Sequence, residues 1–196
     1  MSEILNKRKP EYPVDEIFID RWSPRAYSSM PVSEEEILTL FEAAKWSPSC
    51  FNEQPWMFLY AAKEEDLKIY RSILAEKNQE WANKAPLLVI LLAKRKFESN
   101  GNINNWAEFD CGSAWMSLTL QATELGLYAH AMAGFSQDDV YEKLNINKDE
   151  YKPMVVIAVG HLGDVSGLSP DMGEREKPGE RKPLSKIVTQ GIPHSL

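Results

Sequence analysis

The chain has 196 residues, of which 43% are hydrophobic and 10% aromatic, which is enough for one domain with a substantial core. Its formal net charge of −7 argues against a nucleic-acid partner, because such partners are bound by basic surfaces. Two cysteines make no disulfide framework and suit a reducing compartment. Residues 1–7 show no apolar signal core, and no apolar run reaches the ~20 residues that span a bilayer. We therefore expect one cytoplasmic domain over residues 1–196, with its core at about 14–190, and no membrane partner.

Helix and strand signals alternate along the first half of the chain. A capping box pairs Ser33 with Glu36 at the start of a helix that Pro48 ends. The apolar run Leu87–Ala93 is typical of a strand buried on both faces. The expected elements of this half are a helix over 14–21, the helix that begins at Ser33, a strand over 56–62, an amphipathic helix over 64–77 and the strand over 87–93.

The longest predicted helix covers residues 104–125 and is rich in small residues, with Gly126 as its terminator. Small residues along a helix indicate close approach by another backbone, either a neighbouring helix or a second subunit. Strands are expected over 127–133 and 154–159, with a short helix capped by Ser136 between them. Beyond Gly160 the chain is polar and rich in Pro and Gly. A short tail at 184–188 is expected to pack on the body or on a partner.

The segment 46–56, between a helix and a strand, carries the first functional signal. Pro48 and Pro55 bracket it, so its backbone is neither helix nor central strand. A small hydroxyl, a thiol, two amides and an aromatic lie between them, and such a mixture suits the binding of a flat, hydrogen-bonding ring system. An ordinary helix-to-strand loop is the alternative.

A second signal is the clustering of arginines in an acidic protein. Arg21, Ser23 and Arg25 fall within five residues, and two guanidiniums with a hydroxyl can converge on one phosphate. Arg181 and Lys182 supply two further cations. Taken alone, either cluster is more often a solvated charge group. Glycine-rich nucleotide loops are absent from the sequence, so a phosphate would be held by side chains.

Other chemistries find little support in the sequence. His130, His161 and His194 lack the spacing of metal ligands, and no metal site is expected. A serine hydrolase is disfavoured because the sequence contains no GxSxG elbow.

Several short motifs follow one another in an order typical of one family. They are Arg-x-Ser-x-Arg at 21–25, Asn-x-Gln-Pro-Trp at 52–56, Asn-Gln at 78–79, the helix from Asp110 to Leu-Gly-Leu at 125–127, Met-Ala-Gly-Phe at 132–135, Val-Gly-His at 159–161 and Arg-Lys-Pro-Leu at 181–184. Together they resemble the FMN-dependent nitroreductase family over nearly the whole chain, from about Ile17 to Val188.

The resemblance implies an α+β fold, in which helices flank a central mixed or antiparallel sheet, and an obligate homodimer with two sites at its interface. It also implies FMN as the cofactor and NADH or NADPH as the electron donor. The small-molecule acceptor is expected to be a nitroaromatic, a quinone or a similar flat electrophile, and turnover is expected to be ping-pong. Another reductive flavin reaction, such as dehalogenation, and a non-catalytic flavin-binding or storage protein are the alternatives. Hydride transfer is the cofactor's own chemistry, so no side chain is assigned as catalytic.

The same resemblance implies roles for individual residues. The backbone N–H of Gly134 is expected near the flavin N5, and Asn78 at the polar edge of the ring. Trp22 and Cys50 depart from the commoner family residues: Trp22 either alters the phosphate pocket or packs outward, and Cys50 is either redox-active or inert. The full set of implied FMN-binding residues is Arg21, Ser23, Arg25 and Arg181 at the phosphate and ribityl chain, Asn78, Ala133 and Gly134 at the ring, and Pro48, Ser49, Cys50, Asn52 and Gln54 from the other subunit.

Overall fold

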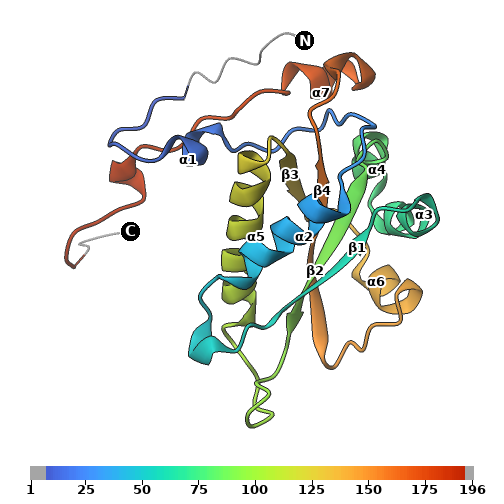
Figure 1. Ribbon diagram of the computed structural model, residues 1–196. Helices are drawn as coiled ribbons and strands as arrows, with labels where there is room; N and C mark the ends of the chain where they lie inside the picture. Colours follow the sequence, from blue (N-terminus) through green and yellow to red (C-terminus); the bar gives the residue numbers. More distant parts are fainter. Residues whose placement is uncertain (1–7, 193–196) are drawn as a thin grey trace.

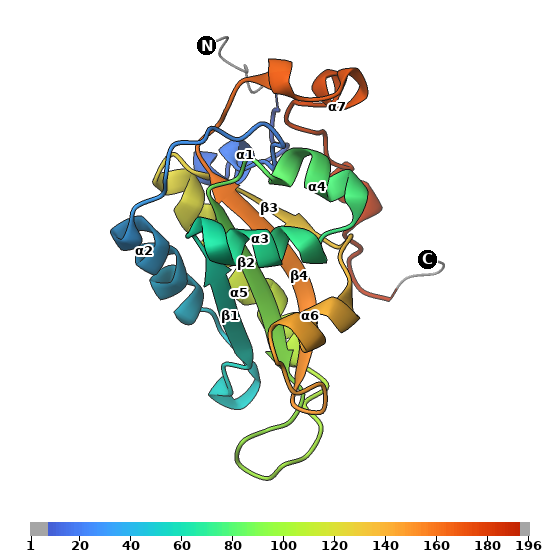
Figure 2. The same ribbon diagram turned by 90° about the vertical axis from the view of Figure 1, so that its right-hand side faces the viewer.

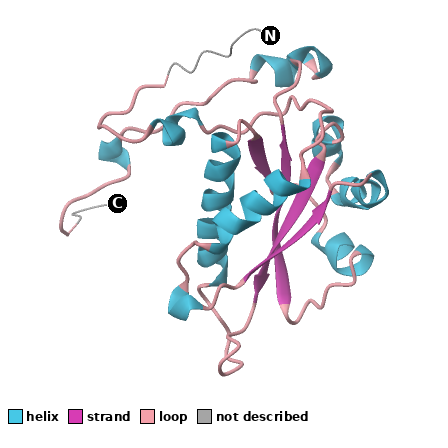
Figure 3. Ribbon diagram, in the orientation of Figure 1, coloured by secondary structure: helices cyan, strands magenta, loops and turns pink. Residues whose placement is uncertain are grey.

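The computed structural model describes residues 8–192 as helices, strands and loops around one sheet (Figure 1, Figure 3). Residues 1–7 and His194, on which two expectations rest, lie outside the described residues. The sheet has the strand order β1-β2-β4-β3, and each neighbouring pair is antiparallel. Its strands are β1 (Trp56–Ala61), β2 (Leu87–Lys94), β3 (Tyr128–Met132) and β4 (Tyr151–Gly160). This confirms the predicted α+β class.

Helices cover both faces of the sheet (Figure 2). On one face lie α2 (Glu34–Lys45) and α5 (Ala107–Glu124), and on the other α3 (Glu64–Ile73), α4 (Glu76–Ala82) and α6 (Gln137–Lys143). Successive residues of a strand point to opposite faces, so Val89 joins the core under α2 and α5 while Ile90 joins the other core. Residues 87–93 are all buried, which confirms a strand covered on both sides.

The capping box and the helix terminator behave as predicted. The Ser33 Oγ accepts from the Glu36 backbone N–H at 3.2 Å, and Glu36 Oε2 accepts from the Ser33 N–H at 2.7 Å. Gly126 follows α5 with φ of +69°, a left-handed conformation that glycine adopts without a Cβ clash.

The prediction of one continuous helix over 64–77 is wrong, because the structure has two helices there, α3 and α4. Leu74 and Ala75 are extended, with ψ of 146° and 147°. Leu74 forms an antiparallel bridge with Phe135, and the Ala75 N–H donates to the Gly134 carbonyl at 3.0 Å. This pairing with the loop after β3 outweighs local helix propensity. Its consequence is that α4 begins beside Gly134.

Two other boundaries differ from the prediction. β4 begins at Tyr151, ahead of the predicted start, and includes Pro153 at the point where the register with β2 shifts between Leu91 and Leu92. Such an irregularity accommodates a proline, which has no N–H for the ladder. α5 begins at Ala107 because the Asn104 side chain accepts from the Trp106 N–H at 3.0 Å and forms a turn there.

The N-terminal segment with α1 (Glu16–Asp20) lies beside the last part of the described chain, which contains the short 3₁₀ turn η3 (Leu184–Lys186) (Figure 1). The chain between β4 and that part contains the 3₁₀ turn η2 (Val165–Gly167), which contacts Lys84 after α4, and α7 (Pro170–Glu174). The Leu184 N–H donates to the Glu11 carboxylate at 2.8 Å. Part of the tail therefore contacts the chain's own N-terminal segment. Within residues 8–192, no helix combines the length and apolar character needed to cross a membrane.

Candidate functional site

Arg21 and Ser23 lie in the turn that follows α1. Arg21 ends the helix in an extended conformation, and its Nη1 donates to the Ser23 Oγ at 3.3 Å. They line a hollow of about 280 Å³ that is strongly basic. The residues around it are Arg8, Arg21, Trp22, Ser23, Arg25, Arg175, Lys177, Gly179 and Arg181. The structure thus brings together all four residues that the sequence assigned to a phosphate.

The cations of this hollow are held close enough to disfavour one another's charge. Burial lowers the pKa of Arg21, and the nearby Arg181 and Arg8 lower it further. The pKa of Arg8 is lowered by burial first and by Arg181 second. Like charges in a partly buried site repel, and a bound anion relieves that repulsion. The hollow therefore has the electrostatics of an anion site.

Arg8 is a member of the site that the sequence did not reveal. Its guanidinium donates to the backbone carbonyls of Ile19 and Arg21, the latter at 3.2 Å. It stands outside any recognisable motif, ahead of the first predicted helix. Only the fold of the N-terminal segment places it beside Arg21.

Trp22 lies between Arg21 and Ser23 in the sequence and packs against the body of the protein. Its side chain is buried, and its ring meets Tyr128 edge-on with centroids 5.9 Å apart. The expectation that it packs outward is wrong. Trp22 instead anchors the turn to β3.

A second hollow of about 570 Å³ lies at the end of β3 and beside α4. The Asn78 Nδ2 donates to the Gly134 carbonyl at 2.9 Å across its edge. A Cβ built on Gly134 would lie 2.7 Å from that Nδ2, so a side chain there displaces the amide. The hollow is lined by Ala75, Glu76, Lys77, Asn78, His130, Ala131, Met132, Ala133 and Gly134. Asn78, Ala133 and Gly134 are therefore brought together, as the sequence predicted.

His130 connects the two hollows. It lines the second, and its Nδ1 lies 2.8 Å from the Pro24 carbonyl in the turn of the first. A carbonyl only accepts, so Nδ1 carries the proton. Burial lowers the pKa of His130 to about 4, so the ring is neutral at pH 7. Its ring also packs on Trp81 at 4.6 Å.

The loop Pro48–Gln54 lies apart from both hollows of its own chain. In Figure 1 it is near the start of α5, while α1 lies near the other end of that helix. Phe51, Asn52 and Gln54 have left-handed backbones with φ between 51° and 57°. The Cys50 N–H donates to the buried Asp110 carboxylate of α5 at 3.1 Å. This loop is thus anchored to α5 through Asp110 and does not meet Arg21. Ser49 and Cys50 are half-buried in it, and the exposed members are Pro48, Asn52 and Gln54.

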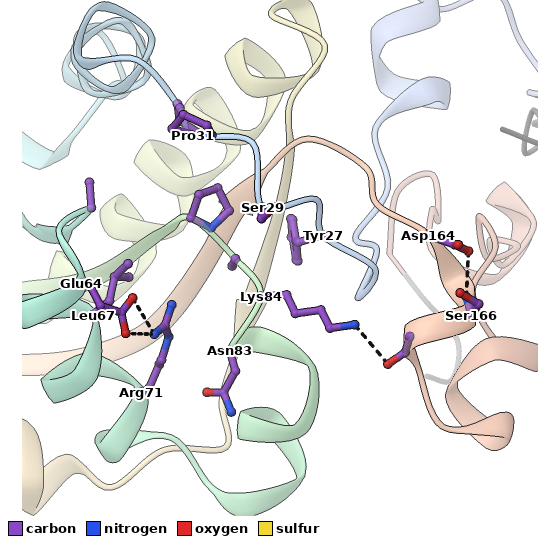
Figure 4. A pocket seen from close by; sticks show the side chains of 15 residues that line it. Tyr27, Ser29, Pro31, Glu64, Leu67, Arg71, Asn83, Lys84, Asp164 and Ser166 are labelled. Atoms are coloured by element: carbon purple, nitrogen blue, oxygen red, sulfur yellow. Dashed lines mark hydrogen bonds and ion pairs between the residues drawn. The ribbon is translucent and has the colours of Figure 1, made fainter.

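A third hollow, of about 710 Å³, contains none of the residues singled out by the sequence (Figure 4). Its charged groups already have partners: Arg71 pairs with Glu64 at 2.8 Å, and the Lys84 Nζ donates to the Gly167 carbonyl at 3.4 Å. The Asp164 carboxylate accepts from the Ser166 N–H at 2.9 Å. The Lys84–Gly167 contact connects the segment after α4 to the C-terminal segment, whereas the other two contacts lie within α3 and within residues 164–166.

Comparison with known proteins agrees with this geometry. The sequence profile of the Nitroreductase family matches residues 19–77 and 61–161. The chain belongs to the nitroreductase family. A solved structure described as an oxidoreductase containing FMN is 41% identical, with 96% of each chain covered and a TM-score of 0.91. A protein of Xanthomonas oryzae pv. oryzae, provisionally named NADH dehydrogenase/NAD(P)H nitroreductase, is 26% identical over 87% of this chain and 93% of its own. A structure from Clostridium acetobutylicum, provisionally named NADH oxidase, is 26% identical, with 90% of this chain and 99% of its own covered and a TM-score of 0.71.

Proposed function

We propose that this nitroreductase-family protein binds FMN along the two hollows and uses it for oxidoreduction. The convergence of Arg8, Arg21 and Arg181 around Ser23 carries the proposal. Burial and the neighbouring cations lower the pKa of Arg8 and of Arg21, and a bound anion would relieve that repulsion. The Asn78–Gly134 hollow, joined to it through His130, has polar groups for the edge of a ring. The related structure that contains FMN supports the choice of cofactor.

FMN held here would supply the redox chemistry, which is hydride transfer between NADH or NADPH and an electron acceptor. The protein's own residues position and stabilise. Arg21 and Arg181 supply charge-assisted donors for the phosphate, and Ser23 a neutral one. The Asn78 Nδ2 is engaged by Gly134, which leaves its Oδ1 to accept a hydrogen bond from the ring edge. Gly134 offers its backbone N–H near N5.

The proposal includes a homodimer in which the loop Pro48–Gln54 reaches the partner's flavin. The support is exposure of large apolar side chains on this side of the molecule: Phe51 is 90% exposed and Phe109 of α5 is 77% exposed. Apolar patches of this kind mark protein interfaces. Trp46 and Trp106 are exposed nearby in sequence. A second copy covers them and brings Ser49, Cys50 and Asn52 to the site. The two free cysteines fit a reducing compartment such as the cytoplasm.

The acceptor we propose is a nitroaromatic, a quinone or a similar flat electrophile. It and the nicotinamide each need to stack on the same ring within ~3–3.5 Å of the reacting atom, so they bind in turn. Turnover is then ping-pong.

The test begins with the purified protein and two flavins. FMN is expected to bind stoichiometrically and riboflavin far more weakly, because riboflavin lacks the phosphate. Equal affinity for the two would overturn the phosphate assignment. NADH or NADPH should then bleach the flavin anaerobically, and a panel of nitroaromatics and quinones should reoxidise it. Parallel double-reciprocal lines support ping-pong turnover, and intersecting lines contradict it. A flavin that is reduced by neither nicotinamide would favour a storage protein.

A further inference from the structure

Glu176 is a buried carboxylate in the segment after α7, and no sequence motif marks it. Its side chain is 0% exposed. Its Oε1 accepts from two successive backbone N–H groups, that of Arg25 at 2.5 Å and that of Ala26 at 2.7 Å. Its Oε2 lies 3.7 Å from the Arg25 Nη1 and has no hydrogen bond in the described part of the chain. A residue near the end of the chain therefore binds the turn that carries Arg21 and Ser23.

A carboxylate is buried at a large desolvation cost unless hydrogen bonds and an opposite charge compensate it. Within the described residues, this compensation comes from the backbone N–H groups of Arg25 and Ala26 and from the Arg25 guanidinium. Hydrogen bonds to an ionised acceptor are stronger than those between neutral groups. Two N–H groups that donate to the same oxygen are both fixed in direction. Glu176 therefore fixes the backbone at the end of the phosphate-site turn.

The contact also changes the role of Arg25. Its guanidinium faces the Glu176 carboxylate, so its charge is partly neutralised before any ligand binds. Arg8, Arg21, Lys177 and Arg181 bring further cationic side chains to the hollow. The buried Oε2 itself is closed to ligands, because its surface is covered. Glu176 consequently acts through Arg25 and Ala26 and makes no contact of its own with a cofactor.

The fold does not depend on Glu176 alone at this point. The Gly163 N–H donates to the Ala26 carbonyl at 2.8 Å, and the Ser28 N–H donates to the His161 carbonyl at 3.0 Å. These bonds hold the C-terminal segment to residues 26–28 independently of Glu176. Removal of its side chain should therefore free the turn while leaving the pairing beside it.

We infer that Glu176 is the positioning residue of the phosphate site: it sets the turn 21–25 for phosphate binding and makes the C-terminal segment part of the cofactor site. This rests on the proposed FMN function. If Glu176 has only a structural role, its removal should lower the stability of the protein in general. If it is a positioning residue, its removal should lower the affinity for FMN, which has a phosphate, and not the affinity for riboflavin, which has none.

Three variants separate these roles. Glu176→Ala removes both backbone acceptors. Glu176→Gln keeps an oxygen acceptor and removes the charge. Glu174→Ala, at an exposed position two residues earlier at the end of α7, is the matched control. Affinities for FMN and riboflavin are measured by flavin fluorescence, and exchange of the Arg25 and Ala26 amides is measured without flavin.

We expect Glu176→Ala to weaken FMN about tenfold or more, since two buried donors lose their acceptor. Riboflavin affinity should change far less. Glu174→Ala should stay near the wild type. Glu176→Gln should lie between the wild type and Glu176→Ala, because its amide oxygen still accepts but lacks the charge that strengthens the bonds. The amides of residues 25 and 26 should exchange fastest in Glu176→Ala.

Unchanged FMN affinity and amide protection in Glu176→Ala would overturn the inference. So would an equal loss for FMN and riboflavin, or a Glu176→Gln variant as weak as Glu176→Ala. If the wild type binds no FMN, the proposed function fails instead. The amide exchange, which needs no flavin, then decides whether Glu176 fixes the turn.

Discussion

The side-chain amide of Asn78 donates to the Gly134 carbonyl across 2.9 Å and connects α4 to the loop after β3. The same carbonyl accepts from the Ala75 N–H at 3.0 Å. Two segments more than fifty residues apart are therefore held by one oxygen atom at the second hollow. The break between α3 and α4 makes this possible, since a continuous helix would leave the Ala75 N–H bonded within the helix.

A side chain at Gly134 should disrupt this contact. Its Cβ would lie 2.7 Å from the Asn78 Nδ2, so Gly134→Val displaces the amide and crowds the hollow. We expect weaker FMN binding and slower flavin reduction and reoxidation, measured by stopped-flow absorbance. Gly173→Ala, away from this hollow, is the control, because a Cβ there meets only the Val165 Cγ1 at 3.5 Å, an ordinary contact. A Gly134→Val protein with lowered Tm but an intact reduction rate would show that Gly134 only shapes the loop.

Loss of Arg21 should discriminate between flavins. Arg21→Met removes a partly buried guanidinium from the basic hollow and should weaken FMN by ~2–5 kcal/mol, as truncation of a buried charged contact does. Riboflavin should bind the variant almost as it binds the wild type. Lys68→Met removes the same charge from an exposed site on α3 and controls for net charge. Titration calorimetry with both flavins measures the difference, and a similar loss for both would contradict a phosphate contact.

Acid should destabilise the protein partly through His130. Its pKa is lowered to about 4 by burial, while unfolded histidine titrates near 6.5. The unfolded chain then binds a proton that the folded chain excludes, so this contribution to stability is full above about pH 6.5 and is lost as the pH falls to about 4. It amounts to at most about 3 kcal/mol. His130→Phe keeps a ring against Trp81 and removes the titration. Urea unfolding at pH 7, 5.5 and 4 should show a shallower loss in the variant; equal slopes would exclude His130 as the cause.

The loop Pro48–Gln54 should depend on Asp110. Asp110→Leu leaves the Cys50 N–H without its acceptor, which costs about 1–3 kcal/mol if that group stays buried. The left-handed residues of the loop should then relax, with weaker FMN binding per dimer and a raised KM for the acceptor. Asp110→Asn retains an oxygen acceptor and should restore much of both. If Asp110→Leu keeps wild-type FMN affinity and KM, the loop does not complete the site.

A charge on the exposed face of α5 should separate the subunits. Phe109 is 77% exposed, so Phe109→Lys leaves the core of one chain intact and places a charge in the proposed interface. We expect a folded monomer that has lost FMN, seen by analytical ultracentrifugation with absorbance at the flavin wavelength. Ile69→Lys, on α3 at the opposite face of the sheet, should remain a dimer. A flavin-loaded monomer would falsify the shared site.

Local signals in the sequence were sufficient for the elements that local forces determine. The Ser33–Glu36 capping box needs only neighbouring residues, and the burial of β2 on both faces follows from an uninterrupted apolar run. Arg21 and Ser23 lie two positions apart, so a short turn is enough to bring them together. The order of the short motifs along the chain was sufficient to predict the family, which the family profile confirms over residues 19–77 and 61–161.

Long-range pairing decided the remainder. Leu74 interrupts an amphipathic helix because Phe135 offers its backbone a bridge, and no signal within residues 64–77 reports that partner. Glu176 meets the Arg25 and Ala26 amides across about 150 positions, and a lone glutamate in a polar stretch has no sequence signature. The same holds for Arg8 beside Arg21. These contacts exist only once the sheet has brought both ends of the chain to one side, so tertiary structure alone decided them.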